Sequence, residues 1–301
     1  MKQQFLNWRP SGKSAGLLLK VGEILTSYEA QGYHLTIRQL YYQLVAGDVI
    51  ANNLRSYHAI VNLVSQGRLS GLIDWDMIED RVRIPVQNTH WESPEQIIKA
   101  AANSYYNSRW KGQDNYIEVW CEKDAISNIV EPVCRKWDVL FLANRGYSSQ
   151  SAMYDAHKRF VRKSQEGKKL GLIYLGDHDP SGLDMTSDIR GRMGLFLHGG
   201  GDFEGVSRIA LNMDQVRKYD PPENPAKITD SRYRKYVDEY GEASWELDAL
   251  EPSVLAELVE TAILSVLNQT KFRKIAATEK KVKANLLELA EVIDANGVLN
   301  V

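Results

Sequence analysis

The stretch KLGLIYLGDHDPSG, residues 169–182, decides the fold expected for this chain. Its apolar run ends at Leu175, and Gly176 follows. Two carboxylates one residue apart, Asp177 and Asp179, then precede a Pro-Ser-Gly turn. An apolar run of this length between Gly and Pro is typical of a buried strand in a parallel sheet. Beyond the carboxyl end of such a strand, two Asp side chains are costly unless they hold a cation. The alternative is a turn in which an Asp caps the next helix, and the stretch alone leaves both interpretations open.

Strands and helices alternate from Tyr116 onward. The segments expected as strands are 116–122, 139–144, 170–175 and 208–211, and those expected as helices are 123–137, 149–163 and a segment after Pro180. Alternation of this kind predicts an α/β fold with a mostly parallel sheet covered by helices. Residues 113–301 are therefore expected to form one domain with a C-terminal helical extension, which begins after a polar linker at 112–115.

Three acidic residues follow the ends of these strands. Glu122 ends the first strand, and Asp177 and Asp179 follow the third, so all three are expected at the same edge of the sheet. A Glu at a strand end is usually a solvated cap when it is taken singly, but beside the Asp pair it favours a metal site. Oxygen ligands without Cys or clustered His suit Mg²⁺ or Mn²⁺ rather than zinc. His178 is open as a ligand or a bystander, and the bystander is favoured.

The N-terminal third predicts a winged helix-turn-helix domain over residues 1–112. Helices are expected at 14–31, from Ile37 after a capping box at 36–39, and at 54–66, and residues 72–86 resemble a β-hairpin or wing. A further helix is expected from Pro94 to about Trp110. In a winged helix the third helix enters a DNA groove. The side chains that it would present are Arg55, His58, Asn62 and Gln66.

The second helix contains the pair Tyr41-Tyr42. The apolar stripe of this helix places Tyr41 in the core, and Tyr42 lies about 100° further round, on a polar edge shared with Arg38. A tyrosine one turn from a guanidinium group is a candidate nucleophile toward phosphate. An amphipathic surface tyrosine is the commoner alternative.

Composition sets the remaining bounds. The chain has 301 residues and a formal net charge of −2, so overall charge does not indicate nucleic-acid binding. Six basic residues and one acid lie between Lys271 and Lys283, which fits either a solvated helix face or a DNA footprint. Cys121 and Cys134 lie in apolar segments and are expected as buried thiols in a reducing cytosol. No segment has the length of a membrane span or the pattern of a secretory signal, so we expect a cytoplasmic protein.

The motifs together resemble a known family. The strand ending VWCEK at 119–123, followed by GDHDPSG at 176–182, resembles the Toprim domain of topoisomerases and primases. With TIRQLYY at 36–42 and WELDAL at 245–250, the chain resembles the A subunit of type IIB topoisomerases and the related protein that makes meiotic double-strand breaks. The resemblance covers roughly residues 35–250.

The resemblance implies the roles of particular residues. Tyr42 would form a 5′-phosphotyrosyl link to DNA, Arg38 would contact the neighbouring phosphate, and the metal would be held by Glu122, Asp177 and Asp179. Lys123 and Arg145 are weaker candidates for phosphate contact.

The resemblance also implies partners. In this family the tyrosine of one protomer works with the metal site of the other, which implies a homodimer on double-stranded DNA. The chain is short and has no ATPase module, so it resembles a compact, nucleoid-associated member of the kind that a phage or mobile element encodes, and any ATPase would be a separate subunit. Two other functions stay open: a hydrolytic Toprim nuclease without a covalent intermediate, and a non-catalytic winged-helix DNA-binding protein.

Overall fold

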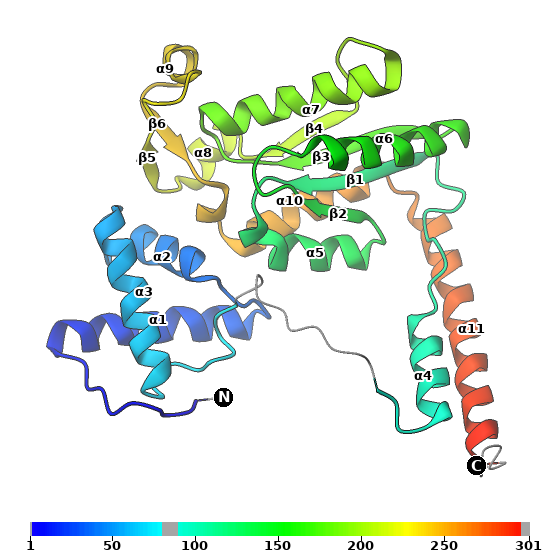
Figure 1. Ribbon diagram of the computed structural model, residues 1–301, viewed down its shortest axis with the longest axis horizontal. Helices are drawn as coiled ribbons and strands as arrows, with labels where there is room; N and C mark the ends of the chain where they lie inside the picture. The colour runs from blue at the N-terminus through cyan, green and yellow to red at the C-terminus, as the bar shows by residue number, and fades with distance from the viewer. Residues whose placement is uncertain (1, 80–89, 296–301) are drawn as a thin grey trace.

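The structure, a computed structural model, describes residues 2–79 and 90–295 (Figure 1). Its centre is a four-stranded parallel sheet in the order β2-β1-β3-β4. The strands are β1 Asn115–Cys121, β2 Leu140–Ala143, β3 Lys169–Leu175 and β4 Val206–Ala210. All four strands lie where the alternation of the sequence predicts them, and the α/β fold with a parallel sheet flanked by helices is confirmed.

Helices cover both faces of this sheet because its central strands are apolar on both sides. Val119 and Cys121 of β1 pack in a core with residues of α5 (Ser127–Lys136) and α10 (Pro252–Val266). Trp120, between them, points to the opposite face and packs in a core with α6 (Gln150–Gln165) and α7 (Pro180–His198). A short 3₁₀ helix, η1 (Asp124–Ile126), connects β1 to α5. Strands buried in this way read as continuous apolar runs, which is why the sequence reveals them.

The N-terminal helices form a bundle with a separate core. They are α1 Gly12–Ala30, α2 Ile37–Ala46 and α3 Leu54–Leu69. The predicted capping box starts α2, because Thr36 Oγ1 accepts the Gln39 N–H at 3.3 Å and Gln39 Oε1 accepts the Thr36 N–H at 2.9 Å. Residues 72–79 contain a single bridge, between Leu35 and Ile78, and no strand. The rest of the expected wing, 80–86, lies outside the described residues, so the winged helix stays a prediction.

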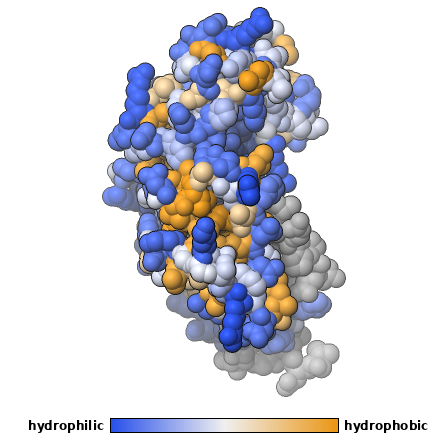
Figure 2. Space-filling model, turned by 90° about the vertical axis from the view of Figure 1, so that its left-hand side faces the viewer, coloured by the Kyte–Doolittle hydropathy of each residue, from blue (hydrophilic) through white to orange (hydrophobic). Residues whose placement is uncertain are grey.

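Part of the surface of this bundle is apolar. Figure 2, which looks at the molecule from the left of Figure 1, shows apolar side chains gathered in the middle of that face, at the height of the N-terminal helices. Leu19 of α1 and Leu54 of α3 are among the large apolar side chains that stay exposed. The buried face of α3 includes Ile60, Leu63 and Val64.

The last helix of the first 112 residues does not join this bundle. α4 (Pro94–Ser104) runs beside the long C-terminal helix α11 (Gln269–Ala295), away from α1–α3 (Figure 1). It ends at Ser104, so the prediction that it reaches Trp110 is wrong. Glu279 of α11 is buried there and accepts hydrogen bonds from the Arg109 guanidinium at 2.9 Å and the Asn107 N–H at 3.1 Å.

A small antiparallel pair of strands lies beside the sheet, above the N-terminal helices in Figure 1. It consists of β5 Glu223–Pro225 and β6 Ala243–Trp245, and α8 (Met213–Tyr219), α9 (Tyr233–Tyr240) and the 3₁₀ helix η2 (Leu247–Ala249) lie around it in sequence. Cys121 and Cys134 are buried free thiols, as predicted. Among the residues described, no helix combines the length and apolarity needed to cross a bilayer.

Candidate active site

The site begins where the two central strands end. Cys121 and Leu175 are paired in register, so the residues after them emerge side by side. Glu122 donates its N–H to the Leu175 carbonyl at 2.9 Å, and its Oε2 accepts the Asp177 N–H at 2.9 Å. Burial raises the pKa of Glu122, and the charge of Asp179 adds to the rise, although the bond from Asp177 opposes it. Glu122 and Asp177 therefore meet at one sheet edge, as the sequence predicts.

Asp179 serves as the N-cap of α7. Its Oδ1 accepts the Gly182 N–H at 2.6 Å, and its Oδ2 lies 4.0 Å from the Lys227 ammonium. The helix-cap interpretation, which the sequence leaves open, thus describes this residue, and its role as a metal ligand stays a prediction.

His178 points into an aromatic cage. Its ring packs against Tyr236, Tyr240 and Trp245, and its Nδ1 lies 3.0 Å from the Tyr236 hydroxyl. Burial lowers the pKa of His178 to about 4, so the ring is neutral at pH 7. In this geometry His178 is a bystander to the acidic residues on either side.

The backbone of His178 brings a second acidic segment to the site. His178 N–H donates to the Trp245 carbonyl at 2.9 Å, and Trp245 N–H donates to the His178 carbonyl at 3.0 Å. The next residues after Trp245 are Glu246, Leu247 and Asp248, and the Leu247 N–H donates to Asp177 Oδ1 at 2.7 Å. This bridge aligns two acid-x-acid segments that are about 70 residues apart in the chain.

Three carboxylates converge as a result. Asp177, Glu246 and Asp248 each offer an oxygen, and these oxygens lie within 4.8 Å of one another. We call these residues the acidic triad. Asp177 and Asp248 are buried, and Asp248 Oδ2 has no hydrogen-bond partner among the described residues. An oxygen-rich set with an unused buried oxygen can hold a cation.

Lys123 lies within the acidic triad. Its ammonium nitrogen is 2.8 Å from Asp177 Oδ2 and 2.9 Å from Asp248 Oδ1, and it also pairs with Glu246. Burial lowers the pKa of Lys123, but the three carboxylates outweigh burial and raise it well above its ordinary value. The ammonium is therefore charged and enclosed by the same oxygens that could hold a metal ion.

Arg208 of β4 holds the loop that carries the acids. Its half-buried side chain donates to the carbonyls of Gly176 at 2.8 Å, Asp177 at 2.5 Å and Gly182 at 3.0 Å. It also donates to the Thr186 hydroxyl at 2.8 Å. Arg208 thus fixes the position of the Asp177 backbone relative to the start of α7.

Tyr42 reaches this site from the N-terminal bundle. The expectation that Tyr42 lies on an exposed polar edge is wrong: its side chain is 4% exposed, because α2 packs on η2. Its hydroxyl is hydrogen-bonded by the Asn224 side chain. Burial raises the pKa of Tyr42, and the charges of Glu246 and Asp248 raise it further, so the phenol is protonated at neutral pH. Tyr41 lies in the core, as predicted, and donates to Asn52 Oδ1 at 2.8 Å.

Arg38 lies at the rim of the same site. Arg38 is exposed. Partial desolvation lowers the pKa of its guanidinium group, but the charges of Asp248 and Glu246 outweigh this effect and raise the pKa. Tyr42 and Arg38 are therefore brought together with the acidic triad of their own chain. The family resemblance implies a meeting of this kind between two protomers.

The other predicted contact residues lie on outer surfaces. Arg55, His58 and Asn62 are exposed on α3, and Gln66 is half-buried. Arg145 is exposed and pairs with Asp124 at 3.4 Å. In the basic segment of α11, five residues are exposed and Lys283 is half-buried. These positions are compatible with contact to a large anionic ligand.

Glu246 and Asp248 are the acids that sequence reasoning missed. The family resemblance includes WELDAL at 245–250 but assigns no role to its acids. The signal was present, because the segment repeats the acid-x-acid spacing of Asp177 and Asp179 between apolar residues.

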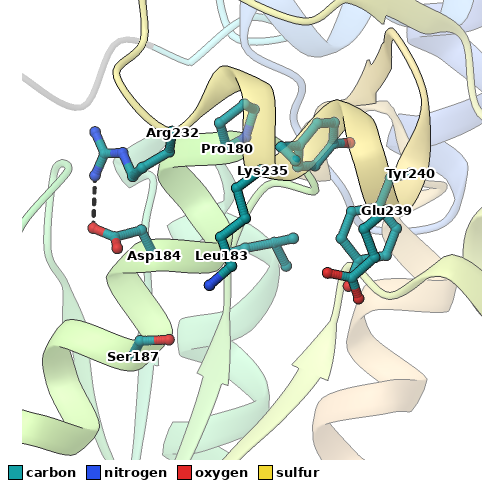
Figure 3. Close-up of a pocket in the computed structure, with 9 residues that line it drawn as sticks. Pro180, Leu183, Asp184, Ser187, Arg232, Lys235, Glu239 and Tyr240 are labelled. Atoms are coloured by element: carbon teal, nitrogen blue, oxygen red, sulfur yellow. Dashed lines mark hydrogen bonds and ion pairs between the residues drawn. The ribbon is translucent and has the colours of Figure 1, made fainter.

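A separate cavity of about 220 Å³ lies between α7 and α9 (Figure 3). An ion pair between Arg232 and Asp184, with nitrogen and oxygen 2.6 Å apart, lies at one side of it, and Lys235 and Glu239 approach it from α9. No member of the acidic triad lines this cavity.

The chain matches no protein-family model and no curated protein.

Proposed function

We propose that the chain is a metal-dependent DNA-cleaving enzyme in which Tyr42 attacks a backbone phosphate, like the A subunit of the type IIB topoisomerases that its motifs resemble. One observation carries the proposal. Tyr42 and Arg38 belong to α2 of the N-terminal bundle, yet α2 packs on η2, which carries Asp248 of the acidic triad, and the charges of Glu246 and Asp248 act on both side chains. A nucleophile, a phosphate-binding cation and a metal-binding set are the groups that such a reaction needs.

The acidic triad suits a divalent cation such as Mg²⁺ or Mn²⁺. It offers carboxylate oxygens alone, which hard cations prefer, and Asp248 Oδ2 is buried without a partner among the described residues. The ion would be held by Asp177, Glu246 and Asp248. The Glu122 carboxylate would support this arrangement by accepting the backbone N–H of Asp177. The bound ion would supply neutralisation of charge on the phosphate and the leaving oxygen.

The side chains of the chain itself would carry out the transfer. The Tyr42 oxygen would form a bond to phosphorus and lose its proton, the bond from phosphorus to the 3′ sugar oxygen would break, and that leaving oxygen would take up a proton. The products are a tyrosine joined to a 5′ phosphate and a free 3′ hydroxyl, and the reverse attack would reseal the strand. The amide of Asn224 bonds the Tyr42 oxygen and favours its ionised form, against the effect of burial. Arg38 would orient the phosphate through its guanidinium group.

Double-stranded DNA as substrate and a homodimer belong to the same proposal. One tyrosine can join one strand, so a double-strand break needs two copies of the chain. Arg55, His58 and Asn62 on the exposed face of α3 would contact the DNA. A separate ATPase subunit remains a prediction of the resemblance.

A covalent-trapping assay tests the proposal. The protein is incubated with supercoiled DNA and Mg²⁺, the reaction is stopped with detergent, and samples are compared with and without protease. We expect DNA to be trapped with protein in the wild type and not in Tyr42→Phe. Tyr41→Phe is the matched control, because it loses a hydroxyl one residue away that bonds Asn52 instead. Equal trapping by Tyr42→Phe would refute the covalent role of Tyr42.

Hydrolysis is the second candidate function, and the burial of Tyr42 favours it. A buried phenol with a raised pKa is a poor nucleophile until it is ionised, whereas water could attack in its place. This candidate predicts that Tyr42→Phe cuts at the parental rate and leaves free ends. If Asp177→Asn and Glu122→Gln change no activity and metal gives no thermal stabilisation, both candidates fail, and a non-catalytic DNA-binding protein remains.

A further inference from the structure

We propose that Lys123 is a displaceable cation. Its ammonium occupies the acidic triad while no metal is bound, and a divalent ion takes over the same oxygens and releases Lys123 toward Tyr42, where it can pair with phosphate. This inference rests on the metal site of the proposed function. It adds that Lys123 stabilises the acidic triad without metal and contacts phosphate once metal is bound.

The contacts show that the two cations need the same atoms. The Lys123 nitrogen is 2.8 Å from Asp177 Oδ2 and 2.9 Å from Asp248 Oδ1, and it pairs with Glu246 Oε2. The second oxygen of Asp177 already accepts the Leu247 N–H at 2.7 Å, so it is committed to holding the loop. A metal ion bound by all three carboxylates therefore has to replace the ammonium at these oxygens.

Charge favours the exchange. Asp177 and Asp248 have side chains that are 7% and 0% exposed, so little water reaches their charges. Three carboxylates at such short range repel one another unless a cation lies among them. Lys123 supplies one positive charge, and a divalent ion supplies two. Lys123 therefore offsets part of the repulsion among the acids, and a divalent ion would offset more of it.

The position of Lys123 gives the released ammonium a use. Lys123 directly follows Glu122 at the end of β1, and its charge is near enough to Tyr42 to favour the ionised phenol. A phosphate that Tyr42 attacks would lie in the same region. Once released from the carboxylates, the ammonium can pair with a phosphate oxygen beside Arg38.

Metal binding by Lys123→Met tests the exchange. The titration uses Mn²⁺ alone, followed by calorimetry, with wild type and variant compared. If the Lys123 ammonium fills the site in more than about nine-tenths of the molecules, less than about one-tenth are free to bind Mn²⁺, and the apparent Mn²⁺ affinity is reduced by that fraction. Removal of the ammonium should therefore tighten Mn²⁺ binding at least about tenfold. Lys136→Met is the matched control, because Lys136 pairs with Glu260 on the surface, and its Mn²⁺ affinity should equal that of wild type.

A second measurement needs no variant and covers the case in which Lys123→Met does not fold. Wild-type protein is treated with an amine-acylating reagent with and without Mn²⁺, and modified lysines are quantified by mass spectrometry. We expect Mn²⁺ to increase the modification of Lys123 severalfold and to leave Lys136 unchanged.

The outcomes separate this inference from the proposed function. Tighter Mn²⁺ binding by Lys123→Met, or Mn²⁺-dependent exposure of Lys123, supports the exchange. Equal affinities with unchanged modification overturn it but leave the metal site intact. An absence of Mn²⁺ binding by both proteins overturns the exchange together with the metal part of the proposed function, while the trapping assay judges Tyr42 independently.

Discussion

Gly182 offers the sharpest test of how the site is built. It lies in the first turn of α7, and a Cβ atom at this position would be 2.3 Å from the Asp177 carbonyl oxygen and 3.1 Å from Glu122 Oε2. Real Cβ atoms essentially never approach other atoms within 3.0 Å, so the Asp177 backbone or the start of α7 has to shift in Gly182→Ala. The same carbonyl oxygen accepts from Arg208, which restricts the available movement.

The expected loss of stability follows from two opposed effects. Crowding a packed interior costs about 1–3 kcal/mol, whereas Ala in place of Gly inside a helix gains about 0.5–1 kcal/mol. We therefore expect Gly182→Ala to lower the free energy of unfolding by about 1–2 kcal/mol. Because Asp177 belongs to the acidic triad, Mn²⁺ affinity should fall as well. Urea unfolding and Mn²⁺ calorimetry measure the two effects.

Gly191→Ala is the matched control in the same helix. A Cβ there meets only Asp202 Oδ1, at 3.9 Å, which is ordinary contact. This variant should gain about 0.5–1 kcal/mol of stability and keep its Mn²⁺ affinity. The two substitutions are chemically identical and should have opposite signs. If Gly182→Ala were as stable as Gly191→Ala and bound Mn²⁺ like wild type, the close packing of α7 on Asp177 would be wrong.

Three further outcomes follow from buried charges. Glu118 is fully buried and accepts from Arg159 at 2.7 and 2.8 Å, so Arg159→Met should lower the free energy of unfolding by about 3 kcal/mol in urea. Arg208→Lys should destabilise the chain by about 2 kcal/mol and weaken Mn²⁺ binding in calorimetry, because one ammonium cannot satisfy the carbonyls on both sides of the loop. Burial raises the pKa of Glu279, but Arg109 outweighs burial and holds it below 4.5. As pH falls, Glu279 is therefore protonated in the unfolded chain before it is protonated in the folded chain, so stability decreases below about pH 4.5. Glu279→Gln should make the melting temperature depend less on pH in this acidic range.

The central sheet could be predicted because each strand carries its own signal. β1 and β3 are buried on both faces, so they are mostly apolar and end abruptly at polar or glycine residues, and the one buried acid of β1, Glu118, is paired with Arg159. Parallel strands end at one edge, which is why Glu122 and Asp177 were expected together and are found together. The course of α4 carries no comparable signal. Helical periodicity shows that a helix has an apolar face, but not that this face packs on α11 rather than on the N-terminal bundle.

Long-range packing also explains what was missed at the site. The polar edge assigned to Tyr42 follows from the sequence of α2 alone, and it is η2, some 200 residues later, that covers this edge. Glu246 and Asp248 join the site because two backbone hydrogen bonds align Trp245 with His178. Such a bridge depends on backbone groups that every residue has, so side-chain patterns do not announce it.

The same bridge explains why the tyrosine and the acids share one site. Trp245 is fixed to the loop that follows β3, and η2 directly follows Trp245, so η2 has one face toward Asp177 and another toward α2. Tyr42 packs on that second face, and its distance from the acidic triad is therefore set by a single short segment. A change that loosens the pairing of Trp245 with His178 should move Glu246 and Asp248 away from Asp177 and from Tyr42 together. If the proposed function holds, metal affinity and the reactivity of Tyr42 should therefore change together when η2 moves.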